Sequence, residues 1–243
     1  LEGCVMLDLH QIAKKYKCDK FDLGYTKHYE KKFEGIRHDV TKILEIGLNT
    51  GGSHLMWLDY FPNANVYAID NRIVYEDKVY DKRTGRDMVM VNGWDDRDKD
   101  RSAVFRGDQS SVKDLNEFIN KNGDEFDIII DDGGHSMRQQ QTSFKILYKY
   151  LKSGGIYVIE DLHTSSNQWT ELYGYTIVED GDTLSMTLME DFENQTDSIK
   201  STKHIATEEM LDIRNKLNSC VVETGLNRYQ NYVWPTTLSF MDF

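Results

Sequence analysis

Two short, almost wholly apolar runs in this chain each end in a pair of acidic residues. Residues 126–130 run into Asp131 and Asp132, and residues 156–159 run into the pair Glu160–Asp161. Each run has the length and character of a strand buried on both faces of a parallel sheet. Ligands bind at the carboxyl edge of the strands in open α/β sheets. We therefore expect these carboxylates to converge on one cleft, together with the nearby histidine at position 135.

Carboxylates that converge with a histidine suit two chemical roles. Carboxylate oxygens are ligands for a hard cation such as Mg²⁺, and a neutral imidazole can serve as a general base. The three cysteines, Cys4, Cys18 and Cys220, are widely separated and show no metal-site spacing. They fit free thiols in a reducing compartment, which predicts a cytoplasmic location.

Composition limits the fold and the partners. The 243 residues are enough for one large α/β domain or, alternatively, two small ones, and the hydrophobic fraction of 39% supports a core. The formal charge of −12 disfavours broad contact with nucleic-acid phosphates. No apolar stretch approaches the length of a membrane span, and no signal peptide is visible. We expect neither a nucleic-acid nor a membrane partner.

Apolar runs alternate with helical patterns along the chain. The expected strands are residues 42–47, 65–69, 104–106, 127–130 and 156–159. The expected helices are residues 7–17, 25–33, 54–61, 111–122 and 136–151. This alternation predicts an α/β fold with a doubly wound, Rossmann-like, mostly parallel sheet. We expect residues 1–40 to form a helical segment that contributes to the functional site, and residues 41–243 to form the main domain.

The sequence also predicts features outside these strands and helices. Ser53 is the expected N-cap of the helix that follows the first strand. Residues 71–102 form an unusually long charged connection, with a weak strand candidate at 88–91. We expect a helix near 183–192 and an antiparallel C-terminal hairpin within 214–223.

Residues 45–52, Glu-Ile-Gly-Leu-Asn-Thr-Gly-Gly, lie between the first strand and its helix. Glycines at such a turn let the backbone approach a ligand closely. Asp70 ends the next strand, where a carboxylate can accept both hydroxyls of a ribose. The glycine spacing is not that of NAD-binding proteins, which disfavours a dehydrogenase. It resembles the pattern of class I S-adenosylmethionine-dependent methyltransferases, although an ordinary strand–turn–helix with glycines for packing is the alternative.

Further cofactor contacts are expected at the ends of the later strands. Asp108 is placed to meet the amino group of an adenine. Asp131 is open to other interpretations, because it could instead cap the following helix or orient the loop. The candidate cofactor-binding residues are Glu45, Gly47, Asn49, Gly51, Ser53, Asp70, Asp108, Gln109 and Asp131.

Several motifs together resemble the macrocin and mycinamicin sugar O-methyltransferases. They are Asp-Asp-Gly-Gly-His at 131–135, Ile-Glu-Asp-Leu-His-Thr-Ser at 159–165, Asp19-Lys20, His-Tyr-Glu at 28–30, and the stretch 43–57. The resemblance covers residues 10–70 and 103–165. It implies a Rossmann-like methyltransferase fold, S-adenosylmethionine, a magnesium ion and methyl transfer to a sugar hydroxyl.

Carried over by position, the resemblance also implies roles for individual residues. Asp132 and Asp161 would be metal ligands, with Glu30 as a third, and His135 would be the general base. Glu30 and His135 could alternatively be surface residues of their helices. Glu160 is open between a supporting and a structural role, and His163 is the next candidate base.

These observations predict a metal-dependent O-methyltransferase that acts on a carbohydrate or glycosylated small molecule. One alternative is an enzyme that methylates a catechol-like diol in a similar metal cleft. Another is a non-catalytic Rossmann-like module of a larger glycan-modifying protein. We also expect either a homo-oligomer or a place within a longer polypeptide.

Overall fold

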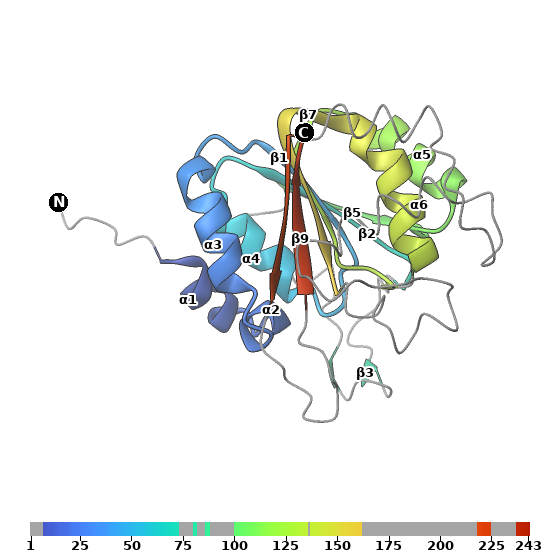
Figure 1. Cartoon of the computed structure of the whole chain (residues 1–243). Helices are drawn as coiled ribbons and strands as arrows, with labels where there is room; N and C mark the ends of the chain where they lie inside the picture. Colours follow the sequence, from blue (N-terminus) through green and yellow to red (C-terminus); the bar gives the residue numbers. More distant parts are fainter. Residues whose placement is uncertain are drawn as a thin grey trace, which may run out of the picture.

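The structure of this chain is a computed structural model that describes residues 7–72, 80–81, 86–87, 100–135, 137–161, 218–224 and 237–243. A seven-stranded sheet forms its centre, in the order β5-β2-β1-β6-β7-β9-β8 (Figure 1). Its strands are β1 (Lys42–Ile46), β2 (Asn65–Asp70), β5 (Ser102–Arg106), β6 (Phe126–Asp131), β7 (Leu151–Glu160), β8 (Ser219–Thr224) and β9 (Thr237–Asp242). A separate two-stranded ladder pairs β3 (Tyr80–Asp81) with β4 (Arg86–Asp87).

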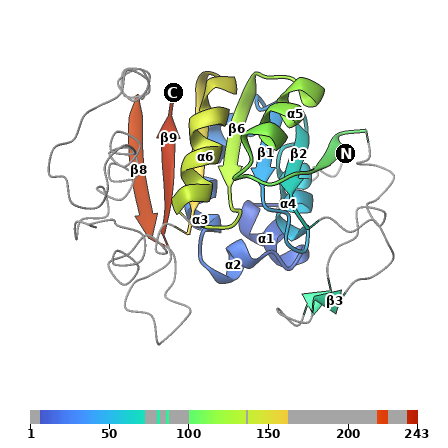
Figure 2. The same cartoon turned by 90° about the vertical axis from the view of Figure 1, so that its right-hand side faces the viewer.

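Strand direction confirms the expected doubly wound sheet. β1 pairs in parallel with both β2 and β6, β2 with β5, and β6 with β7. β9 runs antiparallel to β7 and to β8, so the sheet ends in antiparallel C-terminal strands as expected, although between other residues. The parallel strands all end at one edge of the sheet, and in Figure 2 the arrowheads of β1 and β6 point toward α2 at that edge.

Helices cover both faces of the sheet. One face carries α1 (Leu9–Lys15), α2 (Asp19–Asp22), α3 (Thr26–Phe33), the short 3₁₀ turn η1 (Glu34–Ile36) and α4 (Gly52–Tyr60). The other face carries α5 (Val112–Asn122), α6 (Met137–Leu147) and the 3₁₀ turn η3 (Tyr148–Tyr150). Figure 1 shows the two groups on opposite sides of the sheet. Their buried side chains form two separate hydrophobic clusters, one on each face.

Aromatic packing fixes the N-terminal helices against the sheet. The ring of Tyr29 contacts those of Trp57 and Phe240 edge-on, with centroids 5.1 and 5.4 Å away. Phe33 extends the same cluster. Full burial of a large apolar side chain contributes about 1.5–3 kcal/mol, so these rings anchor α3 and α4 to the sheet.

Three local predictions need correction. Helix α4 begins at Gly52 with Gly51 as its N-cap, not Ser53, because Gly51 adopts a left-handed backbone with φ of 77° that glycine tolerates. The hairpin pairs β8 with β9 rather than lying within 214–223. The sequence patterns also gave no helix at α2. The expected strand at 88–91 and helix near 183–192 lie outside the described residues.

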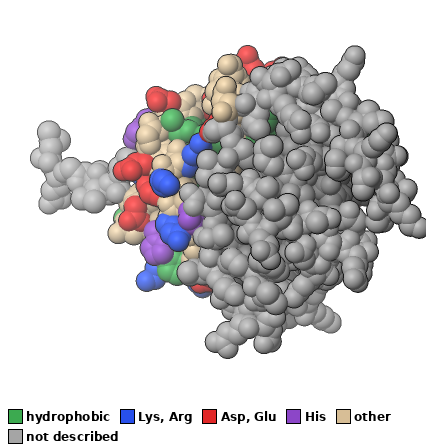
Figure 3. Space-filling view, in the orientation of Figure 1, with side chains coloured by type: hydrophobic (Ala, Val, Ile, Leu, Met, Phe, Trp, Pro, Cys, Tyr) green, Lys and Arg blue, Asp and Glu red, His purple; other side chains and the backbone are tan. Residues whose placement is uncertain are grey.

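The surface of the described residues carries side chains of both charges (Figure 3). On the described part of the face in Figure 3, acidic, basic and histidine side chains are interspersed. The negative net charge therefore does not produce a surface of a single sign there.

In the described part of the chain, none of the helices combines the length and the apolar character needed to span a bilayer.

Candidate active site

Asp132, His135 and Asp161 meet where β6 and β7 end. Each offers one ligand atom, and these atoms all lie within 4.8 Å of one another. The His135 Nε2 atom lies 3.3 Å from Oδ2 of Asp161 and 3.9 Å from Oδ1 of Asp132. All three side chains are partly exposed. The structure thus brings together the residues expected as base and as two metal ligands, and we call them the strand-end cluster.

Two residues of the cluster have a left-handed backbone conformation. His135 and Asp161 have positive φ angles of 54° and 57°. The left-handed region costs a non-glycine residue about 1–2 kcal/mol, although His and Asp tolerate it better than most. Such residues gather at functional sites, where the surrounding structure holds them in place. In this conformation the His135 imidazole and the Asp161 carboxylate lie 3.3 Å apart.

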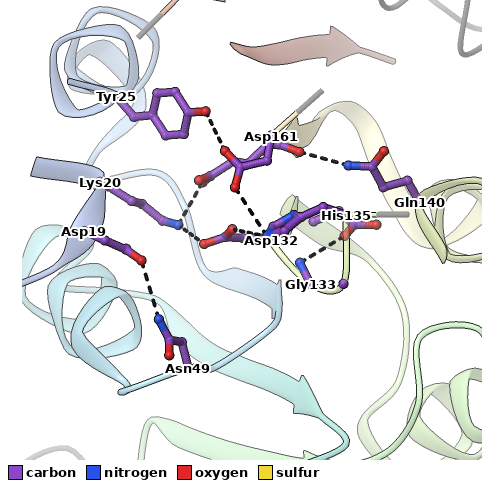
Figure 4. Close-up of polar contacts among 12 residues, drawn as sticks. Asp19, Lys20, Tyr25, Asn49, Asp132, Gly133, His135, Gln140 and Asp161 are labelled. Atoms are coloured by element: carbon purple, nitrogen blue, oxygen red, sulfur yellow. Dashed lines mark hydrogen bonds and ion pairs between the residues drawn. The ribbon is translucent and has the colours of Figure 1, made fainter. Parts of the chain in front are cut away.

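The N-terminal helices donate hydrogen bonds to the cluster. The Lys20 ammonium lies 2.5 Å from Oδ2 of Asp132 and 2.9 Å from Oε1 of Glu160. The Tyr25 hydroxyl donates to Oδ1 of Asp161 at 2.7 Å, and the Tyr29 hydroxyl donates to Glu160. Figure 4 shows Lys20 and Tyr25 reaching from this side toward the two aspartates. These helices are therefore part of the cluster's hydrogen-bond network.

Lys20 dominates the electrostatics of the site. Its side chain is fully buried, and Glu45 also lies 3.9 Å from its ammonium. Burial lowers the pKa of Lys20, but Asp132 and Glu160 more than offset this and raise it well above its ordinary value. Burial raises the pKa of Asp132 to about 6, against the pull of Lys20. A charged lysine thus compensates carboxylates that burial would otherwise neutralise.

A second buried network supports the loop that carries His135. The amide of Gln109 donates to Oδ1 of Asp131 at 3.0 Å, and its carbonyl oxygen accepts from the Gly134 N–H at 2.5 Å. Ser143 donates to the other oxygen of Asp131. Burial raises the pKa of Asp131 to about 6. Asp131 therefore orients this loop, which was one of its expected roles.

A cavity of about 660 Å³ adjoins the strand-end cluster. Its size is within the range of about 300–1,000 Å³ for small-molecule sites. Asp132, His135 and Asp161 line it together with residues from the ends of β1, β2 and β5. Among the predicted cofactor-binding residues, the cavity is lined by Gly47, Asn49, Asp70, Asp108 and Gln109.

Asp70 stabilises the loop at residues 45–52, here called the glycine loop, and also lines the cavity. Its Oδ2 accepts from the Leu48 N–H at 2.8 Å, and its Oδ1 accepts from the Arg72 N–H at 2.7 Å. A carboxylate has about four acceptor positions, so these bonds leave capacity for a ligand. Oδ1 of Asp108 similarly accepts from the Ser110 N–H at 2.8 Å.

Four predicted cofactor-binding residues lie away from the cavity lining: Glu45, Gly51, Ser53 and Asp131. Glu45 is fully buried and accepts from the Trp57 indole at 3.1 Å. Burial raises its pKa to about 7, against Lys20 and a hydrogen bond from Ser53. These four residues therefore support the loops around the cavity and do not line it.

The structure does not bring Glu30 to the strand-end cluster. Its Oε2 accepts from the Leu9 N–H at 2.5 Å, and its Oε1 from the Tyr60 hydroxyl at 3.2 Å. Successive residues of an α-helix point about 100° apart, so Glu30 faces α1 and α4 while Tyr29 faces the sheet. The side chain that enters the cluster from α3's N-cap is instead Tyr25.

Lys20, Tyr25 and Tyr29 were not assigned roles from the sequence. Lys20 lies in the Asp-Lys motif that carried the family resemblance, but nothing in the pattern shows it to be buried. Tyr25, Tyr29 and Phe33 are spaced four apart, which indicates a common helical face. Two tyrosines on a buried helical face could have indicated that polar groups lie opposite, because buried tyrosine hydroxyls need hydrogen-bond partners.

Asp132 and Asp161 fit a hard divalent cation. They present carboxylate oxygens from neighbouring strand ends, and both are partly exposed to the cavity. Among the described residues, no cysteine belongs to a group of metal-binding spacing. The donor set therefore favours magnesium-like chemistry over that of zinc.

Comparison with known proteins finds O-methyltransferases that are similar to this chain. No protein-family model matches the chain. This chain is 33% identical over 167 residues to 8-demethyl-8-(2-methoxy-alpha-L-rhamnosyl)-tetracenomycin-C 3'-O-methyltransferase of Streptomyces olivaceus. It is 31% identical over 167 residues to mycinamicin VI 2''-O-methyltransferase of Micromonospora griseorubida. Each match covers 65% of this chain but 37% of the relative, so the chain spans well under half the length of these curated relatives.

A solved structure extends the likeness to the whole fold. The MycE methyltransferase of the mycinamycin pathway, in complex with Mg, SAH and mycinamycin VI, matches with a TM-score of 0.60 and 24% identity. The match covers 98% of this chain and 55% of that chain. The comparisons confirm the class I, Rossmann-like methyltransferase fold and the resemblance to the macrocin and mycinamicin sugar O-methyltransferases.

Proposed function

We propose that this chain is the catalytic part of a metal-dependent O-methyltransferase that transfers a methyl group from S-adenosylmethionine to a sugar hydroxyl of a glycosylated small molecule. One observation carries the proposal. In a methyltransferase fold, the strand-end cluster of Asp132, His135 and Asp161 lines the same cavity as Gly47 and Asp70. The residues proposed for cofactor binding and those proposed for the metal and the base therefore line one cavity. Two sequence relatives, named as O-methyltransferases of a rhamnosyl-tetracenomycin and of mycinamicin VI, support the choice of acceptor.

Gly47, Asn49, Asp70, Asp108 and Gln109 would contact the cofactor. Gly47 has a φ of 90°, and a Cβ there would lie 2.1 Å from the carbonyl oxygen of Asp132. Glycine is therefore required for the loop to pass this close to the neighbouring strand end. Asp70 would accept the ribose hydroxyls from its place at the end of β2.

Asp132 and Asp161 would hold the magnesium ion. When bound, the ion would lower the pKa of an acceptor hydroxyl and fix its direction. His135 lies beside both carboxylates, so its imidazole can take the hydroxyl proton as the oxygen attacks the methyl carbon. The bond between that carbon and the cofactor sulfur breaks in the same step. General-base assistance of this kind contributes about 10²–10⁴-fold to the rate.

The N-terminal segment, residues 1–40, would complete this site. Lys20 and Tyr25 supply hydrogen bonds to its carboxylates, and Asp19 lines the cavity. The main domain, 41–243, would supply the cofactor-binding loop and strand ends. The predictions of a cytoplasmic location, and of a homo-oligomer or a longer polypeptide, remain predictions.

Methyl transfer from labelled S-adenosylmethionine tests the proposal directly. Glycosylated polyketides, free sugars and catechols serve as acceptors, with Mg²⁺, after chelation, and after Mg²⁺ is restored. We expect transfer to sugar-bearing acceptors that chelation abolishes and Mg²⁺ restores, and loss of transfer in Asp161→Asn. Transfer to catechols alone would support the diol alternative. Full activity after chelation would refute the metal role, and no binding of S-adenosylhomocysteine in calorimetry would refute the cofactor assignment.

A further inference from the structure

The two aspartates of the strand-end cluster share one hydrogen-bonding arrangement. Oδ2 of Asp132 accepts from the Lys20 ammonium at 2.5 Å, whereas its Oδ1 is the atom that approaches His135. Oδ1 of Asp161 accepts from the Tyr25 hydroxyl at 2.7 Å, whereas its Oδ2 is the atom that approaches His135. In each carboxylate, one oxygen is held by an N-terminal donor and the other faces the cluster.

Burial keeps these donors in place. The side chains of Lys20 and Tyr25 are both 0% exposed. A buried ammonium or hydroxyl that turned away from its carboxylate would lose its hydrogen bond without gaining one from water, which is costly. The two aspartates therefore cannot readily rotate to offer both oxygens to one cation.

The number of oxygens that a carboxylate offers distinguishes cations. Ca²⁺ takes six to eight oxygen ligands and accepts carboxylates in the bidentate mode. Mg²⁺ demands a near-ideal octahedron and is usually held through one or two carboxylates, with waters or substrate oxygens in the remaining positions. Carboxylates confined to one oxygen each suit Mg²⁺ and penalise Ca²⁺.

We propose that Lys20 and Tyr25 are positioning residues that set the cation preference of the site, by restricting Asp132 and Asp161 to one ligand oxygen each. The inference rests on the proposed metal role and adds to it the source of selectivity. Removal of either donor releases one carboxylate oxygen and permits bidentate binding. The loss should therefore favour Ca²⁺ relative to Mg²⁺, rather than weaken both cations alike.

The test is calorimetric titration of chelator-treated protein with MgCl₂ and with CaCl₂, without cofactor or acceptor. The quantity compared is the ratio of the Ca²⁺ to the Mg²⁺ dissociation constant. We expect Tyr25→Phe to lower this ratio about tenfold, because the loss of a group that supports a metal ligand changes metal affinity about 10–100-fold. Lys20→Met should shift the ratio in the same direction, and Lys20→Arg should restore part of it.

Matched controls come from the same segment. Tyr16 donates to Asp59 at 2.6 Å and Lys15 donates to the same carboxylate at 2.6 Å. Asp59 is not part of the strand-end cluster, so Tyr16→Phe and Lys15→Met should keep the wild-type ratio. Circular dichroism and melting curves verify that each variant is folded, and Tyr25→Phe is decisive if Lys20→Met does not fold.

An unchanged ratio in folded Tyr25→Phe would overturn the inference, as would an equal loss of both cations, which a merely structural role predicts. A wild-type protein that binds neither cation would instead refute the metal role itself. The two failures are therefore distinguishable by the wild-type titration alone.

Discussion

Two lysines of the N-terminal segment, Lys15 and Lys20, each pair with a carboxylate that also accepts a tyrosine hydroxyl, and the two groups differ mainly in burial. In the outer group, Lys15 and Tyr16 both donate to Asp59, and the lysine side chain is 50% exposed. In the inner group, Lys20 is 0% exposed and reaches carboxylates from two strand ends. Exposed ion pairs contribute about 0.2–1 kcal/mol because water and salt screen them. The same chemical groups therefore have a small effect at the surface and a large one at the sheet edge.

The largest expected difference between the groups is catalytic. His135→Ala removes the proposed base, which lies beside the carboxylates of the inner group, and should lower turnover about 10²–10⁴-fold, while S-adenosylhomocysteine affinity stays near wild type. Asp59→Asn breaks the outer group and should leave turnover unchanged. Initial rates on a responsive sugar acceptor, with calorimetry of the cofactor product, measure both. Near wild-type turnover in His135→Ala would show that it is not the base.

Stability should separate the two lysines next. Lys20→Met leaves buried carboxylates without their cation and should lower the free energy of unfolding by about 3–5 kcal/mol. Lys15→Met should lower it by at most about 1 kcal/mol. Urea unfolding at a fixed pH compares the two variants. Equal losses would mean that burial does not distinguish the groups.

The pH dependence of stability sharpens the comparison at Glu45. Its pKa rises from 4.5 to about 7 on folding. The folded state then holds more protons than the unfolded state between these values, so this carboxyl makes the protein less stable as pH rises through that window. By linkage the effect is at most about 3 kcal/mol. Glu45→Gln should remove it, so the variant should gain stability relative to wild type from pH 4.5 to 7. Urea midpoints at pH 5 and 8 test this, and a constant difference would contradict it.

The smallest of these effects is expected on the cofactor side of the cavity. Asp70→Ala should weaken S-adenosylhomocysteine binding by about 1.5–3 kcal/mol, the usual value for hydrogen bonds to a charged group. Because Asp70 also braces the glycine loop, Asp70→Asn is the matched variant that retains an acceptor oxygen. Calorimetric titration of both is the measurement. Unchanged affinity in Asp70→Ala would remove this residue from the cofactor site.

The sequence predicted the parts of the site that depend on local pattern. Buried parallel strands followed by carboxylates placed Asp132 and Asp161 at one edge, because strand direction alone brings such ends together. The contacts that depend on tertiary packing could not be predicted from the sequence pattern. Lys20 meets Asp132 across 112 positions of the chain, and Tyr25 meets Asp161 across 136. No local periodicity encodes such pairs. Glu30 was assigned to the cluster from the His-Tyr-Glu match alone, and its carboxylate instead contacts Leu9 and Tyr60.

Local backbone geometry also limited the prediction. Ser53 has the chemistry of an N-cap, yet Gly51 takes that place because the loop needs a left-handed residue there. Glu45 carries the charge expected of a ligand-binding residue, but its strand position faces the indole of Trp57. In both cases the side chain has the chemistry that the predicted role needs, but the backbone conformation does not place it where that role is performed.

The close approach of Gly47 to Asp132 joins two loops that would otherwise act separately. A Cβ at Gly47 would lie 2.1 Å from the Asp132 carbonyl, and the Asp132 N–H donates to Ile46 at 2.9 Å. A ligand that presses on the glycine loop would therefore displace the backbone that carries Asp132, a proposed metal ligand. Cofactor and cation should consequently bind with a coupling free energy, and by thermodynamic reciprocity each should change the other's affinity by the same factor.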